Sequence, residues 1–181
     1  RRRRGMWHRR LGVAQCMSTL PIDVWSDIAC PWCYIGKRNL DASLALLDDS
    51  DDVDPNVVSV DFHSYLLAPD TPPETDAPEI DFLVQSKGMP AEQVRQMFAH
   101  VTQVAADAGL HYDFDIARHA NTRKAHELLH YAKSVGQQAD MAERLFAAHF
   151  TEGKRLGDAI TLGNEQTTID FLAWNGVLEE D

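Results

Sequence analysis

The stretch WSDIACPWCYIGKR, residues 25–38, sets the fold that we expect for this chain of 181 residues. The segment that leads into it, residues 22–26, is short and holds the apolar, β-branched residues Ile22 and Val24, which is typical of a β-strand. Beyond it, apolar residues recur at helical spacing, at Cys33, Leu40, Leu44 and Leu47. The two cysteines therefore lie where a strand ends and a helix over 30–48 begins.

A second strand follows the helix at residues 57–62. Val58, Val60 and Phe62 alternate with polar residues there, so they share one face of the strand. A strand, a helix and a strand at this spacing predict a parallel pair joined by a right-handed crossover. A pair of cysteines separated by two residues in such a unit is typical of a thioredoxin-like redox motif.

The two cysteines are not equivalent in this arrangement. Cys30 lies at the start of the helix, and Pro31 occupies the first turn, where a missing N–H costs nothing. The first amides of the helix and its macrodipole lower the pKa of the Cys30 thiol. Cys33 shares the apolar stripe and should be shielded. We expect Cys30 to attack a disulfide and Cys33 to resolve the mixed disulfide.

Metal binding is the alternative interpretation of the cysteine pair. Half of a zinc site needs a second pair of ligands, and the only other cysteine is Cys16, in a doubtful tail. His126 and His130 lie four residues apart on one face of a predicted helix, but no third ligand has suitable spacing. We therefore predict no metal site, and for these histidines packing or a hydrogen bond.

Two blocks of sequence carry a resemblance to a known family. The first is CPWCYIGK, residues 30–37, and the second comprises residues 121–132 and 145–153. Together they resemble the DsbA family of thioredoxin-fold proteins, in particular its FrnE-like branch. Kappa-class glutathione transferases and 2-hydroxychromene-2-carboxylate isomerases are relatives of that family. The resemblance covers roughly residues 20–160.

The resemblance implies an α+β fold and an enzyme. It implies a thioredoxin-like βαβ half over 20–66, which holds the dithiol, and an inserted all-helical domain over 78–174. The implied function is that of a thiol–disulfide oxidoreductase acting on protein or small-molecule thiols and disulfides. No cofactor is implied beyond the dithiol, and glutathione is a possible co-substrate.

Two rival functions stay open. One is glutathione transferase or isomerase chemistry, although those relatives carry a serine where this chain has Cys30. The other is an inactive, truncated remnant. The chain has no proline after Pro90, whereas the family places a cis-proline before a closing β-hairpin. We therefore expect the C-terminal hairpin to be missing and the chain to be a fragment.

Aromatic and proline residues surround the dithiol. We expect Trp25 to have a core role in its strand and to flank the active site, and we group it with Pro31 and Trp32 as residues that bind the substrate or support the dithiol. Pro31 and Trp32 lie between the cysteines, and we expect Trp32 to be a partly exposed surface that contacts the substrate. No phosphate-binding loop, Ser/His/Asp set or carboxylate pair stands out in the sequence.

Proline, glycine and asparagine positions predict the helices of the second half. We expect helices over 79–87, 90–108, 122–135 and 138–151, with a weaker one over 165–174. Asn121 is the expected N-cap of the helix over 122–135, and Gly136 is the residue expected to end it.

Charge and composition limit the partners. The net charge is −11, which argues against nucleic acid, and no apolar run reaches the length of a membrane span. Residues 1–16 hold six arginines and no acid, and we interpret them as a basic tail that is not native or is disordered. Residues 175–181 form an acidic tail. Three cysteines without a disulfide framework suit a cytoplasmic protein of undetermined oligomeric state.

Overall fold

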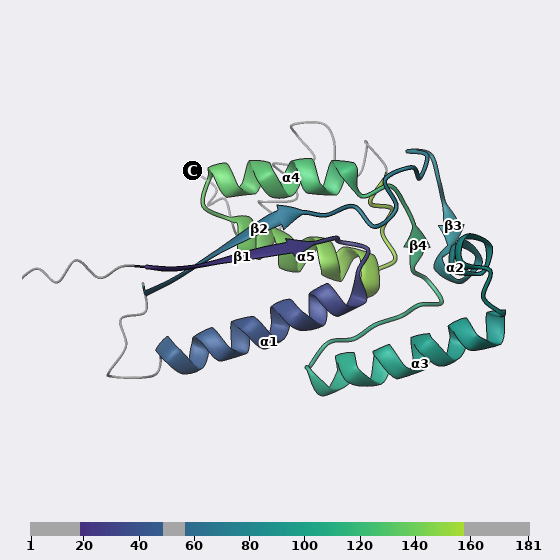
Figure 1. Ribbon diagram of the computed structural model, residues 1–181, viewed down its shortest axis with the longest axis horizontal. Coiled ribbons are helices and arrows are strands. Elements are labelled where there is room, and N and C mark those ends of the chain that lie inside the picture. The colour runs from purple at the N-terminus through teal and green to yellow at the C-terminus, as the bar shows by residue number, and fades with distance from the viewer. Residues whose placement is uncertain (1–18, 49–56, 158–181) are drawn as a thin grey trace, which may run out of the picture.

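The predicted strand–helix–strand unit forms the first part of the chain. The computed structural model describes residues 19–48 and 57–157. The first three elements are β1 (Leu20–Ser26), α1 (Pro31–Asp48) and β2 (Val58–Ser64). The two strands lie side by side and run parallel, as Figure 1 shows. Leu20 pairs with Val58 and Ser26 with Ser64. The predicted parallel pair is confirmed, although β1 begins two residues earlier and β2 ends two residues later than expected.

The second part of the chain is mostly helical. It holds β3 (Ala77–Pro78), α2 (Glu79–Lys87), α3 (Ala91–Asp107), β4 (Arg118–His119), α4 (Arg123–Ser134) and α5 (Gln138–Phe150). The four predicted helices are confirmed to within a residue at each end. Strands β3 and β4 have no counterpart among the predicted elements, because two residues are too few to show a period of two.

Caps explain where the helices begin and end. Gly109 and Gly136 follow α3 and α4 with φ of 74° and 77°, a conformation that glycine adopts without strain. Asn121 accepts a hydrogen bond from the N–H of Arg123 through Oδ1, at 2.9 Å. It therefore binds a free amide of α4 as expected, although Thr122 and not Asn121 is the residue that directly precedes the helix.

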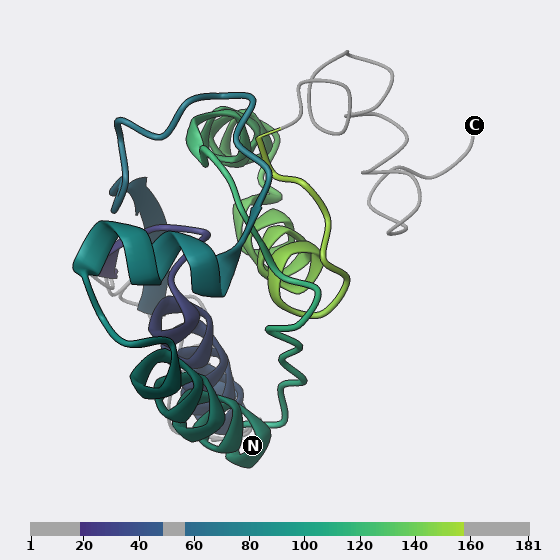
Figure 2. The same cartoon turned by 90° about the vertical axis from the view of Figure 1, so that its right-hand side faces the viewer.

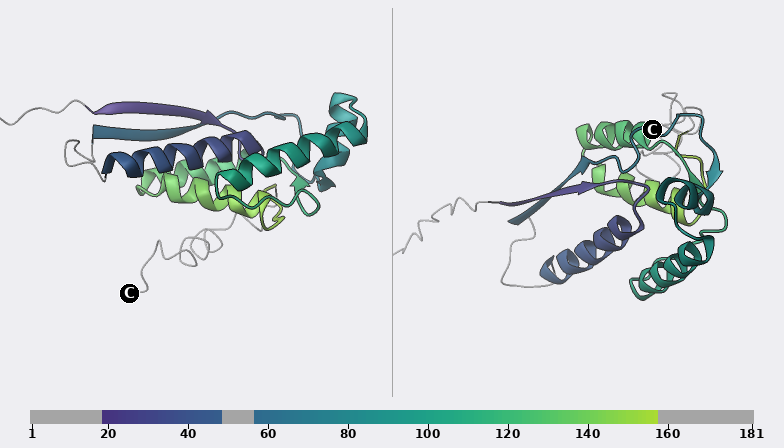
Figure 3. Two further views of the ribbon diagram at one scale, coloured as in Figure 1. Left: turned by 90° about the horizontal axis from the view of Figure 1, so that it is seen from below. Right: turned by 45° about the vertical axis from the view of Figure 1, so that its right-hand side comes forward.

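The helices that pack on the parallel sheet lie on one side of it. In the left view of Figure 3, β1 and β2 form one layer and the helices lie beneath it. Val24 and Val60 face the core on this side. Trp25 points the other way because neighbouring residues of a strand face opposite sides. It is 63% exposed and stacks on His63, with ring centroids 4.8 Å apart. The core position predicted for Trp25 is therefore wrong.

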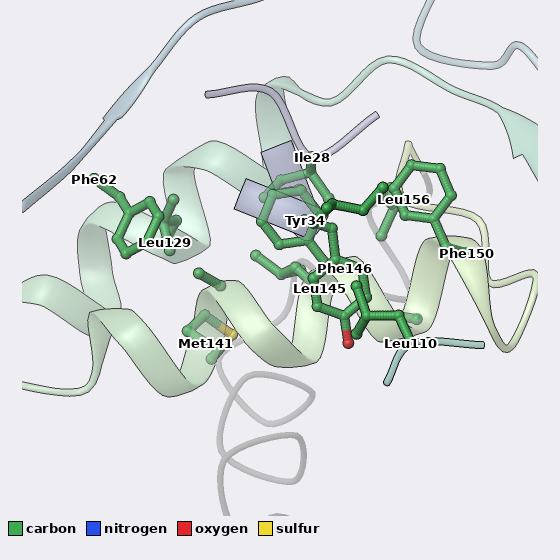
Figure 4. Close-up of a cluster of buried hydrophobic side chains, with 14 of the residues drawn as sticks. Ile28, Tyr34, Phe62, Leu110, Leu129, Met141, Leu145, Phe146, Phe150 and Leu156 are labelled. Atoms are coloured by element: carbon green, nitrogen blue, oxygen red, sulfur yellow. The ribbon is translucent and has the colours of Figure 1, made fainter. Parts of the chain in front are cut away.

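Helix α1 buries a different face from the predicted one. Its fully buried apolar side chains are Tyr34 and Ile35, whereas Leu47 is 38% exposed and Leu40 and Leu44 are only half-buried. The Tyr34 ring lies parallel to that of Phe146 at 5.0 Å, in the core shown in Figure 4. The buried face of α1 is therefore rotated from the predicted face with Leu40, Leu44 and Leu47, because Tyr34 packs against Phe146 of α5.

One hydrophobic core extends through the sheet and the helices. It joins Ile28, Tyr34 and Phe62 of the first part to Leu129 and Phe146 of the second. Helices α2 and α3 pack on each other, and α3 lies beside α1, as Figure 2 shows. The α+β fold is confirmed, while the proposed division at residues 66 and 78 stays a prediction.

Several expectations fall outside the described residues. These are the basic tail over 1–16, the helix over 165–174, the acidic tail over 175–181 and the missing hairpin. Within the ranges 19–48 and 57–157, no further strand joins β1 and β2. In that same part of the chain, no helix is both long enough and apolar enough to span a membrane.

Gln138 completes the hydrogen bonding of β2 on the edge that faces away from β1. Its side-chain oxygen accepts from the N–H of Phe62 at 3.0 Å, and its side-chain nitrogen donates to the carbonyl of Phe62 at 2.9 Å. Both bonds are buried, so the amide takes the place that a neighbouring strand would fill.

We expect Gln138→Leu to lower the free energy of unfolding by about 2 kcal/mol or more. The change leaves the N–H and the carbonyl of Phe62 buried without partners, and each such group costs about 1–3 kcal/mol. Urea denaturation measures the loss. The matched control is Gln93→Leu, at an exposed position on α3. Equal urea midpoints for the two variants would contradict the role of Gln138.

Candidate active site

The turn between β1 and α1 holds both cysteines. The Cys30 N–H donates to the carbonyl of Asp27 at 3.0 Å, which closes the turn after β1. Helix α1 then begins at Pro31, and the Cys33 N–H donates to the carbonyl of Cys30 at 3.1 Å. Both cysteines carry free thiols and are half-buried. Cys33 packs against the core, whereas Cys30 lines a pocket.

Hydrogen bonds set the two thiols apart. The pKa of Cys30 is lowered to about 7, first because the Cys33 thiol donates to its sulfur and then because the amides of Cys33 and Trp32 point at it. Burial and the negative charge of Asp27 oppose this effect. The pKa of Cys33 is raised by the same hydrogen bond, by burial and by the charge of Cys30. Cys30 is thus the thiol that ionises first.

Asp27 is a residue of the site to which the sequence analysis gave no role. Its carboxylate is buried and accepts hydrogen bonds from the N–H of Leu67 at 2.7 Å and the N–H of Ala29 at 3.3 Å. His126 Nε2 lies 3.3 Å from the same carboxylate. Burial raises the pKa of Asp27, but the hydrogen bonds together hold it below its usual value. The sequence feature that could have indicated this role is the position of Asp27, an acidic residue followed by apolar residues in the turn before α1.

The histidines of α4 do not act together. His126 is buried against Asp27, whereas His130 is exposed and lies 2.8 Å from the hydroxyl of Ser64. The predicted hydrogen bonds are therefore confirmed for both histidines. Across the described ranges, no three His, Cys, Asp or Glu side chains are grouped in a way that could hold a metal ion.

Two tyrosines attach the dithiol segment to the helical part. The Tyr112 hydroxyl donates to the carbonyl of Pro31 at 2.7 Å, and the Tyr34 hydroxyl donates to Glu143 at 2.6 Å. Glu143 also contacts Arg38 and the buried ammonium of Lys37. Through these contacts Glu143 of α5 fixes α1 on α5.

A pocket of about 370 Å³ opens beside Cys30. Its walls come from the start of α1, from α2 and α3, and from the segment before α4. Pro31 and Trp32 line it, and Trp32 is 51% exposed, as expected for a contact surface. Trp25 does not line this pocket. The structure therefore brings Cys30, Pro31 and Trp32 together and leaves Trp25 on the outer face of the sheet.

We expect the two thiols of the reduced protein to react with iodoacetamide at different pH. Alkylation of Cys30 should rise with a midpoint near pH 7, because the thiolate is the reactive form. Alkylation of Cys33 should stay slow throughout that range, because its pKa is raised. Peptide mass spectrometry after timed labelling at pH 5–10 measures both. Identical pH profiles would rule out the assigned asymmetry.

Comparison with known proteins agrees with this geometry. The family model described as a DSBA-like thioredoxin domain matches residues 21–167. The Bacillus subtilis protein YwbO is 25% identical over 167 residues, which cover 89% of this chain and 72% of YwbO. A probable DsbA oxidoreductase from Streptomyces coelicolor, SCO1869, superposes with a TM-score of 0.71 at 26% identity.

The coverage of these matches is unequal. The superposition covers 88% of this chain and 63% of the Streptomyces protein, so the chain spans less than two thirds of that protein's length. The cytosolic disulfide reductase DsbM from Pseudomonas aeruginosa shares the fold, with a TM-score of 0.54 and 17% identity over 87% of this chain and 65% of DsbM. Since the family model matches most of the residues, from β1 to beyond α5, the chain belongs to the DSBA-like thioredoxin domain family.

Proposed function

We propose that the protein is a thiol–disulfide oxidoreductase that acts through Cys30 and Cys33. The observation that carries the proposal is the contrast between the two thiols. Cys30 has a pKa of about 7 at the start of a helix, and Cys33 beside it has a raised pKa. Membership of the DSBA-like family supports this at the level of the reaction type.

The proposed reaction has two exchange steps. The Cys30 thiolate attacks one sulfur of the substrate disulfide, and the other sulfur leaves as a thiolate. Cys33 then loses its proton and attacks the Cys30 sulfur, which releases the second substrate thiolate. The protein dithiol is oxidised by two electrons to the Cys30–Cys33 disulfide, and the substrate disulfide is reduced to two thiols.

The order of the steps follows from the charges. The negative charge of Cys30 and the hydrogen bond to it raise the pKa of Cys33. When Cys30 enters the mixed disulfide, that charge is gone, so the pKa of Cys33 falls. Cys33 therefore becomes a nucleophile only after the first step has taken place.

The substrates are protein or small-molecule thiols and disulfides, with glutathione as a possible co-substrate. No cofactor is required beyond the dithiol, and we place the reaction in the cytoplasm. A Cys30 pKa of about 7 matches thioredoxin more closely than DsbA, whose thiol has a pKa of about 3.5. We therefore propose a weaker oxidant than DsbA.

We expect the protein to catalyse the reduction of insulin by dithiothreitol, and Cys30→Ser to abolish this catalysis. Cys33→Ser should also lose turnover, but it should still form a stable mixed disulfide through Cys30. Turbidity measures insulin reduction, and mass spectrometry detects the trapped adduct. Glutathione conjugation that survives in Cys30→Ser would favour the transferase alternative. A folded wild-type protein without either activity would favour the inactive remnant.

We expect Trp32→His to raise the reduction potential by about 30 mV or more, which corresponds to about a tenfold change in the equilibrium constant. A cationic side chain between the cysteines stabilises the Cys30 thiolate and hence the reduced form. Equilibration with glutathione buffers measures the potential. Trp25→His, on the outer face of the sheet, is the control and should leave it unchanged. An equal or lower potential in Trp32→His would contradict the proposal.

A further inference from the structure

One peptide group between the two cysteines makes hydrogen bonds on both of its sides. It joins Pro31 to Trp32, and its N–H points at the Cys30 sulfur. Its carbonyl, which belongs to Pro31, accepts a hydrogen bond from the Tyr112 hydroxyl at 2.7 Å. The peptide is trans, so its N–H and its carbonyl point in opposite directions within one plane. The Cys30 sulfur and the Tyr112 hydroxyl therefore bind the two ends of the same peptide dipole.

Tyr112 comes from outside the strand–helix–strand unit. It lies in the segment between α3 and β4, which passes the start of α1 in Figure 1. The residue is only 4% exposed, and its ring stacks on that of Phe150 with centroids 4.7 Å apart. The edge of the Phe114 ring closes another side at 5.9 Å. The aromatic packing thus holds the hydroxyl in one position.

The Tyr112 hydroxyl stays a donor while Cys30 changes its charge. Burial raises the pKa of Tyr112, and the negative charges nearby add to this effect. The pKa of Cys30 is about 7, so this thiol ionises over a pH range in which the phenol keeps its proton. The hydrogen bond to the Pro31 carbonyl is therefore present both below and above the Cys30 pKa.

Two effects connect this hydroxyl to the thiol. The first is orientation: a planar peptide cannot turn its carbonyl without turning its N–H, so a fixed carbonyl also fixes the donor to the Cys30 sulfur. The second is polarisation, because linked hydrogen bonds strengthen one another by about 10–30% per bond. A thiolate gains more from a good donor than a thiol does, so both effects favour the ionised form of Cys30.

We propose that Tyr112 is a positioning residue of the redox site. Through the Pro31–Trp32 peptide, its hydroxyl orients and strengthens the N–H that stabilises the Cys30 thiolate. The helical part of the chain thereby contributes to the reactivity of a thiol that belongs to the strand–helix–strand unit. For its consequence in catalysis the inference rests on the proposed function, whereas the effect on Cys30 can be measured without any disulfide substrate.

The pH profile of Cys30 alkylation in the reduced full-length protein tests the role of the hydroxyl. Tyr112→Phe removes the hydroxyl and keeps the buried ring. We expect it to raise the midpoint of the profile, normalised to its plateau at high pH, by about half a pH unit, which is about a threefold loss of thiolate at pH 6. Timed labelling with iodoacetamide and peptide mass spectrometry measures Cys30 separately from Cys33.

The matched control is Tyr34→Phe. It removes another buried hydroxyl close to the dithiol, the one that donates to Glu143 at 2.6 Å, and it leaves the Pro31–Trp32 peptide untouched. The control should keep the midpoint of the wild type, and thermal unfolding checks that both variants fold. An unchanged or lowered midpoint in Tyr112→Phe would overturn the proposal. An equal rise in both variants would overturn it too, because general loosening of the packing would explain that result.

A second substitution keeps the proposal testable if Tyr112→Phe does not fold. 3-Fluorotyrosine at position 112 retains the ring and the hydroxyl, and the fluorine makes the phenol more acidic and hence a stronger donor. We expect the midpoint for Cys30 to move to lower pH, opposite to the effect of phenylalanine. The same analogue at position 34 is the control and should leave the midpoint in place. A midpoint that stays or rises with the analogue at position 112 would overturn the proposal.

Insulin reduction separates this inference from the proposed function. Cys30-dependent insulin reduction by the wild type, with no shift of the midpoint in Tyr112→Phe, would overturn the role of Tyr112 and leave the oxidoreductase function intact. The expected shift in a folded protein that does not reduce insulin would overturn the oxidoreductase function and leave the effect of Tyr112 on the thiolate intact.

Discussion

The buried carboxylate of Asp27 is the constraint on which the arrangement of the site depends. A carboxylate removed from water is tolerated only when other groups replace its hydration. Here the replacements come from separate parts of the chain: the amide of Ala29 in the turn, the amide of Leu67 after β2, and His126 on α4. These segments must therefore meet at one point, and Cys30 lies three residues from it.

The same carboxylate affects the thiol chemistry. Its charge raises the pKa of Cys30, while the hydrogen bond from Cys33 and the amides at the start of α1 lower it. The Cys30 pKa of about 7 therefore reflects two opposing influences. Asp27, which holds the fold together, raises this pKa, and the hydrogen bonds that prepare Cys30 for reaction lower it. The buried Asp27 carboxylate thus limits how strongly the site can stabilise the Cys30 thiolate.

Local signals in the sequence predicted much of the fold. Pro31, Gly109 and Gly136 act through their own backbone, so the helix ends could be read without any tertiary information. The features that were missed all depend on partners far along the chain. Trp25 turned outward because the helices occupy the other face of β1, and Glu143 became structural only because Tyr34 and Lys37 lie against it.

The side chain of Gln138 has a consequence for how this sheet can grow. It occupies both peptide groups of Phe62, so the edge of β2 that faces away from β1 is already saturated at its centre. An extended segment, from this chain or another, finds no free donor and acceptor there to start a ladder. The outer edge of β1 is therefore the more favourable place for an additional strand. A single amide side chain thus gives the sheet a preferred direction of growth and hinders self-association at the centre of its opposite edge.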